Sequence, residues 1–179
     1  MKDLFTIAHI TDFHVGREIN FPSGKIDLYD ELLQTARKLV SMEPVPDLVM
    51  VGGDLANHGV DSDYMRVKKV LDEMNIPYCL VVGNHDSRSK MRAIFSGHRR
   101  LHTQSEYIQY VIEDTPVRII VLDTLAVGSH RGLIDKERLT WLDARLAEAP
   151  ERPTMIFLHH PPFETGMPYP DSLGLDGAE

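Results

Sequence analysis

The chain has 179 residues, a formal net charge of −8, and a composition that is 42% hydrophobic and 26% charged. This size and composition are those of a soluble globular protein with a sizeable core, and we expect residues 1–179 to form a single domain. The acidic balance, without a cluster of Lys and Arg, argues against a nucleic-acid partner. No apolar run approaches the length of a membrane span, and the first residues do not begin a signal peptide, so we expect a cytoplasmic protein. Cys79 is the only cysteine, which excludes an intrachain disulfide.

Strand and helix signals alternate through the first half of the chain. Short apolar runs predict strands over 5–10, 48–51 and 79–82, and a loop containing Gly and Pro over 15–25. We expect Asp61 to be the N-cap of the second helix. Apolar residues at helical spacing predict two helices, one with Leu28, Leu32, Ala36 and Leu39 and the other with Tyr64, Val67, Leu71 and Met74.

The second half begins with a short helix over 87–95 and a polar loop over 96–105. Two runs, 107–112 and 117–122, then predict a β-hairpin. A last amphipathic helix is predicted from Leu139, Leu142 and Leu146, with Trp141 packing beside them, and a last strand over 155–158. The β-α-β-α-β opening implies parallel strands, and the hairpin adds a second set. The fold class is therefore predicted to be α/β, with two packed sheets flanked by helices.

Four polar motifs directly follow the buried strands. In open α/β folds, ligand sites form just beyond the carboxyl ends of the strands. Carboxylates, imidazoles and one carboxamide would meet there, a mixture that suits Mn, Fe, Zn or Co and a two-metal site in particular. The motifs are Asp12-Phe13-His14, Gly52-Gly53-Asp54, Gly83-Asn84-His85-Asp86 and His159-His160-Pro161-Pro162.

The residue types within the motifs suit distinct roles. The spacing of Asp12 and His14 would put both side chains on the same side of an extended segment, where they could hold one ion. Asp54 has two carboxylate oxygens, enough to bridge two ions. Asn84 can ligate without adding charge, and His85 can stay off the metals and face a substrate. Each motif alone also fits an ordinary turn or a rigid loop; the ordered set of four favours a site.

The four motifs resemble those of the calcineurin-like metallophosphoesterases, from the first strand to about Phe163. The surrounding segments are most similar to the branch of class III cyclic-nucleotide phosphodiesterases and glycerophosphodiesterases. These segments are 53–57, 83–86, 157–162, and 132–135 leading into 140–142. The resemblance implies hydrolysis of a small phosphodiester, either a glycerophosphodiester or a 3′,5′-cyclic nucleotide, by two divalent metal ions. The composition and the lack of a long apolar run add the expectation of no nucleic-acid partner and no membrane.

The resemblance also assigns metal ligands, residue by residue. Asp12 and His14 would bind the first ion. Asp54 would bridge the two ions. Asn84 and His159 would bind the second ion.

Further roles follow from the same resemblance. His85 would stabilise the phosphoryl oxygens or protonate the leaving group, and Asp86 or a backbone carbonyl would orient it. Two more candidates rest on their positions in the chain and not on the resemblance. Asn57, in the loop after Asp54, could steady a metal-bound ligand or water, and an ordinary loop position is an equal alternative. His130 could meet a substrate phosphate, and solvent exposure is at least as good an interpretation.

The family pattern contains one further motif, Gly-His-x-His, which supplies one histidine to each ion. No histidine follows His160 in this sequence. We therefore expect the chain to be incomplete at its C-terminus, or completed by a partner. An unfinished sheet predicts self-association into a homo-oligomer, and weak anchoring of residues 161–179. Alternative functions are a phosphomonoesterase or nuclease of the same superfamily, or a non-catalytic scaffold that has lost metal ligands.

Overall fold

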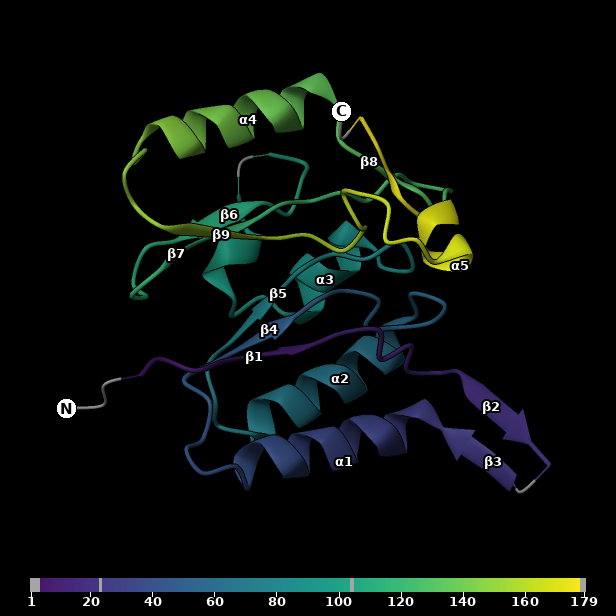
Figure 1. The fold of residues 1–179 in the computed structure, drawn as a ribbon. Helices are drawn as coiled ribbons and strands as arrows, with labels where there is room; N and C mark the ends of the chain where they lie inside the picture. The colour runs from purple at the N-terminus through teal and green to yellow at the C-terminus, as the bar shows by residue number, and fades with distance from the viewer. Residues whose placement is uncertain (1–3, 23, 104, 178–179) are drawn as a thin grey trace.

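Two three-stranded sheets face each other in the computed structural model, which describes residues 4–22, 24–103 and 105–177 (Figure 1). The first sheet has the order β1 (Ile7–Ile10), β4 (Leu48–Val51), β5 (Tyr78–Leu80), and its strands are parallel. The second has the order β6 (Tyr110–Ile112), β7 (Arg118–Val121), β9 (Thr154–Phe157). Its first pair is the predicted antiparallel hairpin, and its second pair is parallel. The predicted α/β sandwich of two sheets is confirmed.

Two helices, α1 (Leu28–Val40) and α2 (Asp61–Glu73), cover the outer face of the first sheet (Figure 1). Their buried apolar faces are the predicted ones, with Leu32, Ala36 and Leu39 on α1 and Tyr64, Val67 and Leu71 on α2. The predicted N-cap of α2 is wrong, because Val60 is the capping residue and no side chain caps the helix. Asp61 is the first residue of the helix, where negative charge is favourable, and it pairs with Lys90 at 3.0 Å.

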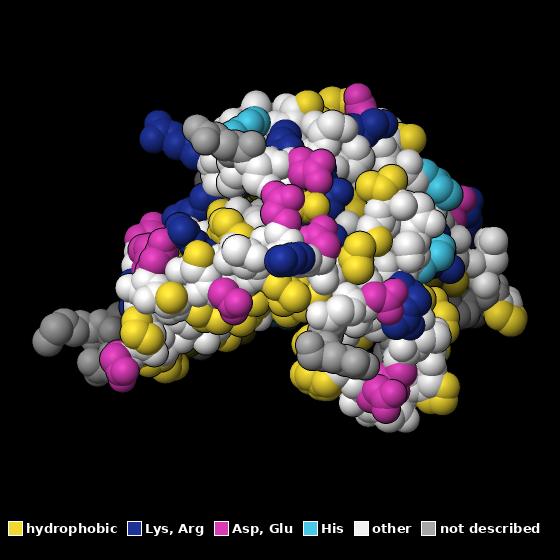
Figure 2. Space-filling view, turned by 90° about the horizontal axis from the view of Figure 1, so that it is seen from above, with side chains coloured by type: hydrophobic (Ala, Val, Ile, Leu, Met, Phe, Trp, Pro, Cys, Tyr) yellow, Lys and Arg dark blue, Asp and Glu magenta, His cyan; other side chains and the backbone are white. Residues whose placement is uncertain are grey.

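The remaining helices are α3 (Arg88–Ile94), α4 (Lys136–Ala147) and α5 (Pro168–Ser172), and a 3₁₀ turn (Arg99–Leu101) lies within the predicted polar loop. Helix α4 covers the second sheet and is less buried than its apolar pattern predicted. Leu139 is 38% exposed, whereas Arg138 is 2% exposed. Figure 2, which views this side from above, shows acidic, basic and hydrophobic side chains interspersed. Helix α4 therefore contacts the body partly through a buried arginine.

Two pairs of short strands were not predicted. The segment expected to be a loop over 15–25 contains most of a hairpin of β2 (Glu18–Phe21) and β3 (Gly24–Asp27), which projects from the body beside α1 (Figure 1). Strands β8 (Gly132–Leu133) and β10 (Leu175–Asp176) pair in parallel. This pairing anchors residues 175–176. Residues 162–169 are exposed, with Phe163, Met167 and Tyr169 at 73%, 56% and 76%, so the expected weak anchoring of the segment from 161 is wrong only near its end. Residues 178–179 lie outside the described part.

The inner faces of both sheets form one hydrophobic cluster, in which all four residues of β4 are buried. Strands β1 and β9 each lie at one edge of their sheet, and the rings of His9 and Phe157 meet edge-on at 5.5 Å. Met155 and Ile156 on β9 are 42% and 40% exposed, so this strand is incompletely covered. Within the described ranges, no helix is both long and apolar enough to span a membrane.

Candidate metal centre

The four polar motifs meet at the carboxyl ends of the strands that precede them. The loop after β1 continues to pair with the loop after β4, since the Asp12 amide donates to the Gly53 carbonyl at 3.0 Å and the His14 amide to the Asp54 carbonyl at 2.9 Å. A cavity of about 620 Å³ opens at this point. All five predicted metal ligands line it, namely Asp12, His14, Asp54, Asn84 and His159.

Three of these residues have left-handed backbone conformations, with φ of 59° at Asp12, 41° at His14 and 53° at Asp54. The prediction that Asp12 and His14 share one side of an extended segment is therefore wrong in its geometry. Two tight turns bring the carboxylate and the imidazole together instead. Such conformations cost about 1–3 kcal/mol each outside glycine, and they cluster at functional sites because the surrounding structure must enforce them.

Two glycines let the loops after β4 and β5 approach each other. A Cβ on Gly53, which has φ of 102°, would lie 2.7 Å from the Gly83 amide nitrogen. A Cβ on Gly83 would lie 2.3 Å from the Asp54 amide nitrogen. Any side chain at either position would push the Asp54 and Asn84 loops apart.

The donor atoms are spaced as metal ligands. Asp54 Oδ2 lies 3.5 Å from His14 Nε2 and 3.6 Å from His159 Nε2, between the two imidazoles. On one side Asp12 Oδ1 lies 3.6 Å from His14 Nε2, and on the other Asn84 Oδ1 lies 3.2 Å from His159 Nε2. Two ligands that each bind one ion at roughly 2.1 Å lie about 3.0–3.4 Å apart for bond angles of 90–109°. One of the four observed spacings lies in this range and the other three exceed it by 0.1–0.2 Å. The residues present therefore fit a divalent metal site around Asp54, which belongs to both groups of close donors, His14–Asp54–His85 and Asp12–Asp54–His159.

Hydrogen bonds orient two of the histidines toward the cavity. His159 Nδ1 lies 2.8 Å from the Gly52 carbonyl, and His85 Nδ1 lies 2.8 Å from the Asn57 carbonyl. Because a carbonyl only accepts, Nδ1 carries the proton in both rings and Nε2 keeps a free lone pair. Within the described ranges, the buried Nδ1 of His14 has no hydrogen-bond partner.

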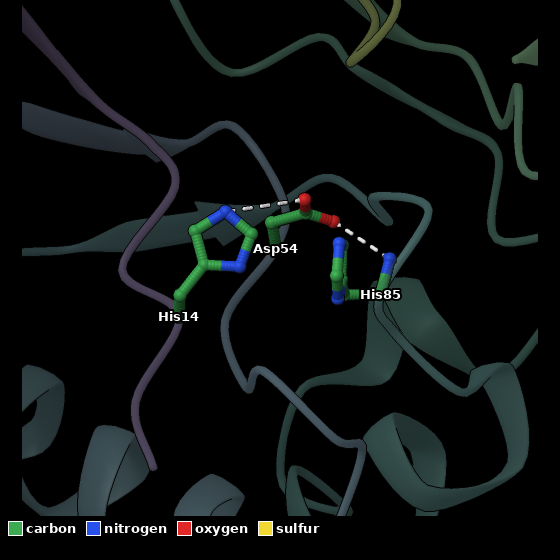
Figure 3. Close-up of side chains that lie close together, drawn as sticks. All are labelled: His14, Asp54 and His85. Carbon is green, nitrogen blue, oxygen red and sulfur yellow. Dashed lines mark hydrogen bonds and ion pairs between the residues drawn. The ribbon is translucent and has the colours of Figure 1, made fainter. Parts of the chain in front are cut away.

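His85 lies beside the predicted bridging residue. Its backbone amide donates to Asp54 Oδ1 at 2.8 Å, and its ring meets that of His14 edge-on at 4.8 Å (Figure 3). One nitrogen of each ring and one oxygen of Asp54 lie within 4.8 Å of one another, so His85 could also reach an ion.

Asp86 faces away from the cavity. Its buried carboxylate accepts hydrogen bonds from the amides of Asp54 (2.8 Å), Gly83 (2.9 Å) and Leu55 (3.1 Å), and from the Tyr64 hydroxyl (3.1 Å). Burial raises the pKa of Asp86 to about 6 against the effect of these donors. The Asn57 carbonyl, and not Asp86, orients His85, so the placement of Asp86 among catalytic residues is not supported by its contacts. Asp86 joins the Asp54 and Asn84 loops instead.

Asp12 and His14 perturb each other. Burial raises the pKa of Asp12, but the interactions with His14 and Thr11 outweigh it, and the net shift is downward. The interaction with Asp12 raises the pKa of His14, and burial opposes it only in part. Each residue thus favours the charged form of the other, and a cation bound between them would replace the imidazole proton.

The two supporting candidates both lie near the site. The Asn57 side chain contacts the ring of His58 at 2.9 Å, so only its backbone carbonyl serves the site. His130 lines the cavity, and its Nδ1 lies 3.1 Å from Asn84 Nδ2. Sequence reasoning missed three further lining residues, Arg17, Tyr169 and Leu173. Only Arg17 is close to a motif, and no sequence pattern identified the other two.

Comparisons with known proteins agree on one family. A family model described as calcineurin-like phosphoesterase matches residues 5–176. A protein of Rhodopseudomonas palustris named as a probable cyclic nucleotide phosphodiesterase is 40% identical over 172 residues, which cover 93% of this chain and 61% of that protein. A probable glycerophosphodiester phosphodiesterase of Arcobacter nitrofigilis is 28% identical over 169 residues, which cover 94% of this chain and 62% of that protein. The chain thus spans about 62% of the length of such relatives.

Solved structures with the same fold share little sequence. A purple acid phosphatase from yellow lupin superposes with a TM-score of 0.62 at 13% identity, covering 92% of this chain and 32% of that one. A phosphopantetheinyl hydrolase from Mycobacterium tuberculosis superposes with a TM-score of 0.55 at 14% identity, covering 97% of this chain and 76% of that one. At these identities the two structures support the fold alone.

Proposed function

Because the chain belongs to the calcineurin-like phosphoesterase family, we propose that it forms the catalytic part of a metal-dependent phosphodiesterase. The observation that carries this proposal is the position of Asp54 Oδ2, 3.5 Å from His14 Nε2 and 3.6 Å from His159 Nε2. Asp12, His14 and Asp54 would hold one ion. Asp54, Asn84 and His159 would hold the other.

The chain's own residues divide the remaining work. Two divalent ions drawn from Mn, Fe, Zn or Co would, when bound, polarise the phosphoryl oxygens and lower the pKa of water. His85 is anchored through Nδ1 and presents Nε2. In the imidazolium form, Nε2 also carries a proton, which it can donate to a phosphoryl oxygen or deliver to the leaving oxygen; in the neutral form it can only accept. Among the described residues that line the cavity there is no Ser, Thr or Cys. Water, whose pKa the bound ions would lower, is the nucleophile that this proposal assigns.

The substrate class is a small phosphodiester, either a glycerophosphodiester or a 3′,5′-cyclic nucleotide. The names of the two relatives support both, and the cavity of about 620 Å³ has room for a small diester. A phosphomonoesterase or nuclease of the same superfamily, or a non-catalytic scaffold, is the alternative. A scaffold would bind no metal, whereas a phosphomonoesterase would prefer p-nitrophenyl phosphate to bis(p-nitrophenyl) phosphate.

The decisive experiment uses metal-free protein reloaded with Mn²⁺ and assayed with bis(p-nitrophenyl) phosphate. We expect His85→Ala to lower kcat by about 10²–10⁴-fold at saturating metal, the usual contribution of general acid–base catalysis. His102→Ala, an exposed histidine that does not line the cavity, is the matched control. An unchanged kcat would remove His85 from the mechanism, and activity that survives exhaustive chelation would reject the metal-dependent reaction.

Three organisational predictions belong with this proposal. They are one domain over residues 1–179, a cytoplasmic location, and self-association without a nucleic-acid partner. The open edge of β9, with Met155 and Ile156 partly exposed, supports pairing with another chain. A single monomeric species across a concentration series in sedimentation velocity would contradict self-association.

A further inference from the structure

The carboxamide of Asn84 lies between two imidazoles. Its Nδ2 is 3.1 Å from His130 Nδ1, and its Oδ1 is 3.2 Å from His159 Nε2. An amide nitrogen can only donate, so His130 Nδ1 accepts this hydrogen bond. The contact decides which end of the carboxamide faces the metal centre. A carboxamide turned by 180° would present an NH₂ group, which cannot ligate a cation.

The loop that carries His130 follows β7, and Asp123 near the start of this loop forms a buried ion pair with Arg88. Asp123 is fully buried, and Arg88 donates to its two oxygens from Nε and Nη2, both at 2.7 Å. The same carboxylate accepts from the amides of Ile108 at 2.8 Å and Leu125 at 3.0 Å. This bidentate contact fixes the orientation of the Arg88 guanidinium relative to the Asp123 carboxylate. Removing either side chain would leave the other as an unpaired buried charge.

A second arginine reinforces the same turn. Arg138 Nη1 donates to the carbonyls of Leu125 at 3.2 Å and Asp123 at 3.3 Å, while Arg88 Nη2 donates to the Leu125 carbonyl at 2.7 Å. Both guanidinium groups lie over the ring of Tyr107, at 5.2 Å for Arg88 and 4.6 Å for Arg138. Both arginines thus hold the turn at residues 123–125, five residues before His130.

Arg88 follows Asp86 by two residues, so the ion pair joins the loop that carries Asn84 to the loop that carries His130. We propose that His130 is a positioning residue that orients Asn84 toward the second metal ion, and that the Arg88–Asp123 pair holds His130 in place. This inference rests on the dinuclear centre proposed above. It gives His130 a different task from contact with a substrate phosphate.

The test measures Mn²⁺ binding by isothermal titration calorimetry on the metal-free, complete gene product. His130→Ala should weaken the second ion by about 10–100-fold, the usual effect of losing a partner that orients a ligand, and leave the first ion unchanged. His130→Asn, which keeps an oxygen acceptor near the position of Nδ1, should restore most of the affinity. If His130→Ala binds each of the two ions as tightly as the wild-type protein does, the positioning role is overturned.

Kinetics separate this role from direct contact with substrate. At Mn²⁺ concentrations that saturate each variant, His130→Ala should recover most of its kcat and keep the wild-type KM for bis(p-nitrophenyl) phosphate. A raised KM with unchanged metal affinity would overturn the proposal in favour of substrate contact. A wild-type protein that binds no second ion would overturn the proposed function as well, so the two failures are distinguishable.

A matched pair of variants on α3 tests the ion pair. Arg88→Lys loses the bidentate contact with Asp123 and should weaken the second ion by about 10-fold. Arg92 lies one turn further along the helix and donates to the carbonyls of Leu101 and Ser105, both at 2.9 Å. The Arg92→Lys variant should be less stable than the wild-type protein but bind metal with the same affinity. Equal metal affinities in both variants would exclude the Arg88–Asp123 pair from the positioning of His130.

Discussion

Replacing Tyr64 with phenylalanine would remove the hydroxyl group that hydrogen-bonds to Asp86 and leave the rest of the side chain unchanged. Tyr64 is fully buried on α2. Its hydroxyl donates to Asp86 Oδ1 at 3.1 Å and accepts from the Ser87 amide at 2.8 Å. Because Asp86 in turn accepts from the amides of Asp54 and Gly83, the hydroxyl supports both loops that carry the proposed metal ligands Asp54 and Asn84.

The expected loss of stability is about 2–4 kcal/mol. A hydrogen bond to a charged group contributes about 1.5–3 kcal/mol, and a buried donor left without a partner costs about 1–3 kcal/mol more. Ser87 is only half-buried, so water can reach its amide and the second contribution falls at the low end. For a domain of this size, 1 kcal/mol corresponds to about 2–4 °C in Tm, which gives a decrease of roughly 4–16 °C.

Urea denaturation of metal-free protein at pH 8 measures the change, because Asp86, with a pKa of about 6, is ionised there. Tyr78→Phe is the matched control. Its hydroxyl donates to Asp72 Oδ1 at 2.6 Å, but the Asp72 side chain is 46% exposed, so water replaces the lost contact and the change should be about 0.5 kcal/mol. If Tyr64→Phe lowers the free energy of unfolding by less than Tyr78→Phe does, the conclusion that Asp86 connects the Asp54 and Asn84 loops is refuted.

Three further predictions concern the same region and the core. Gly83→Ala would place a Cβ 2.3 Å from the Asp54 amide, so both the Tm and the Mn²⁺ affinity should fall; a wild-type Tm would contradict this close approach. Cys79 is buried and its burial raises the pKa of the thiol to about 11, so thiol reagents at pH 8 should label it only as fast as the protein unfolds; rapid labelling of folded protein would contradict its placement. Mn²⁺ at 100 times its Kd should raise the free energy of unfolding by about 2.7 kcal/mol per site, reversibly with EDTA, and an unchanged denaturation midpoint would show that the folded state binds no ion.

The sequence alone predicted the elements that bring the site together. The strands of the first sheet are short apolar runs, and the helices α1 and α2 have clear 3.6-residue periodicity, so their order implied a parallel sheet. Parallel strands end at one edge, and this placed Asp12, Asp54 and Asn84 near one another. These inferences need only local patterns and one topological rule, which is why they agree with the structure.

Tertiary structure decided how the same residues are presented. The left-handed turns at Asp12 and His14 depend on amide contacts with the loop after β4, some 40 residues away, and no local pattern contains them. The same holds for the Asn57 carbonyl that orients His85, and for His130, which is 46 residues from Asn84.

Asp86 and Arg138 show the same limit for buried charge. The sequence predicted Asp86 as a residue that could orient His85, and no pattern pointed to burial of Arg138. Both are buried in the fold, because distant amides and carbonyls supply the hydrogen bonds that compensate their desolvation. Residue types and periodicity therefore determined which groups meet, whereas contacts between distant segments determined which atom of each group faces the cavity.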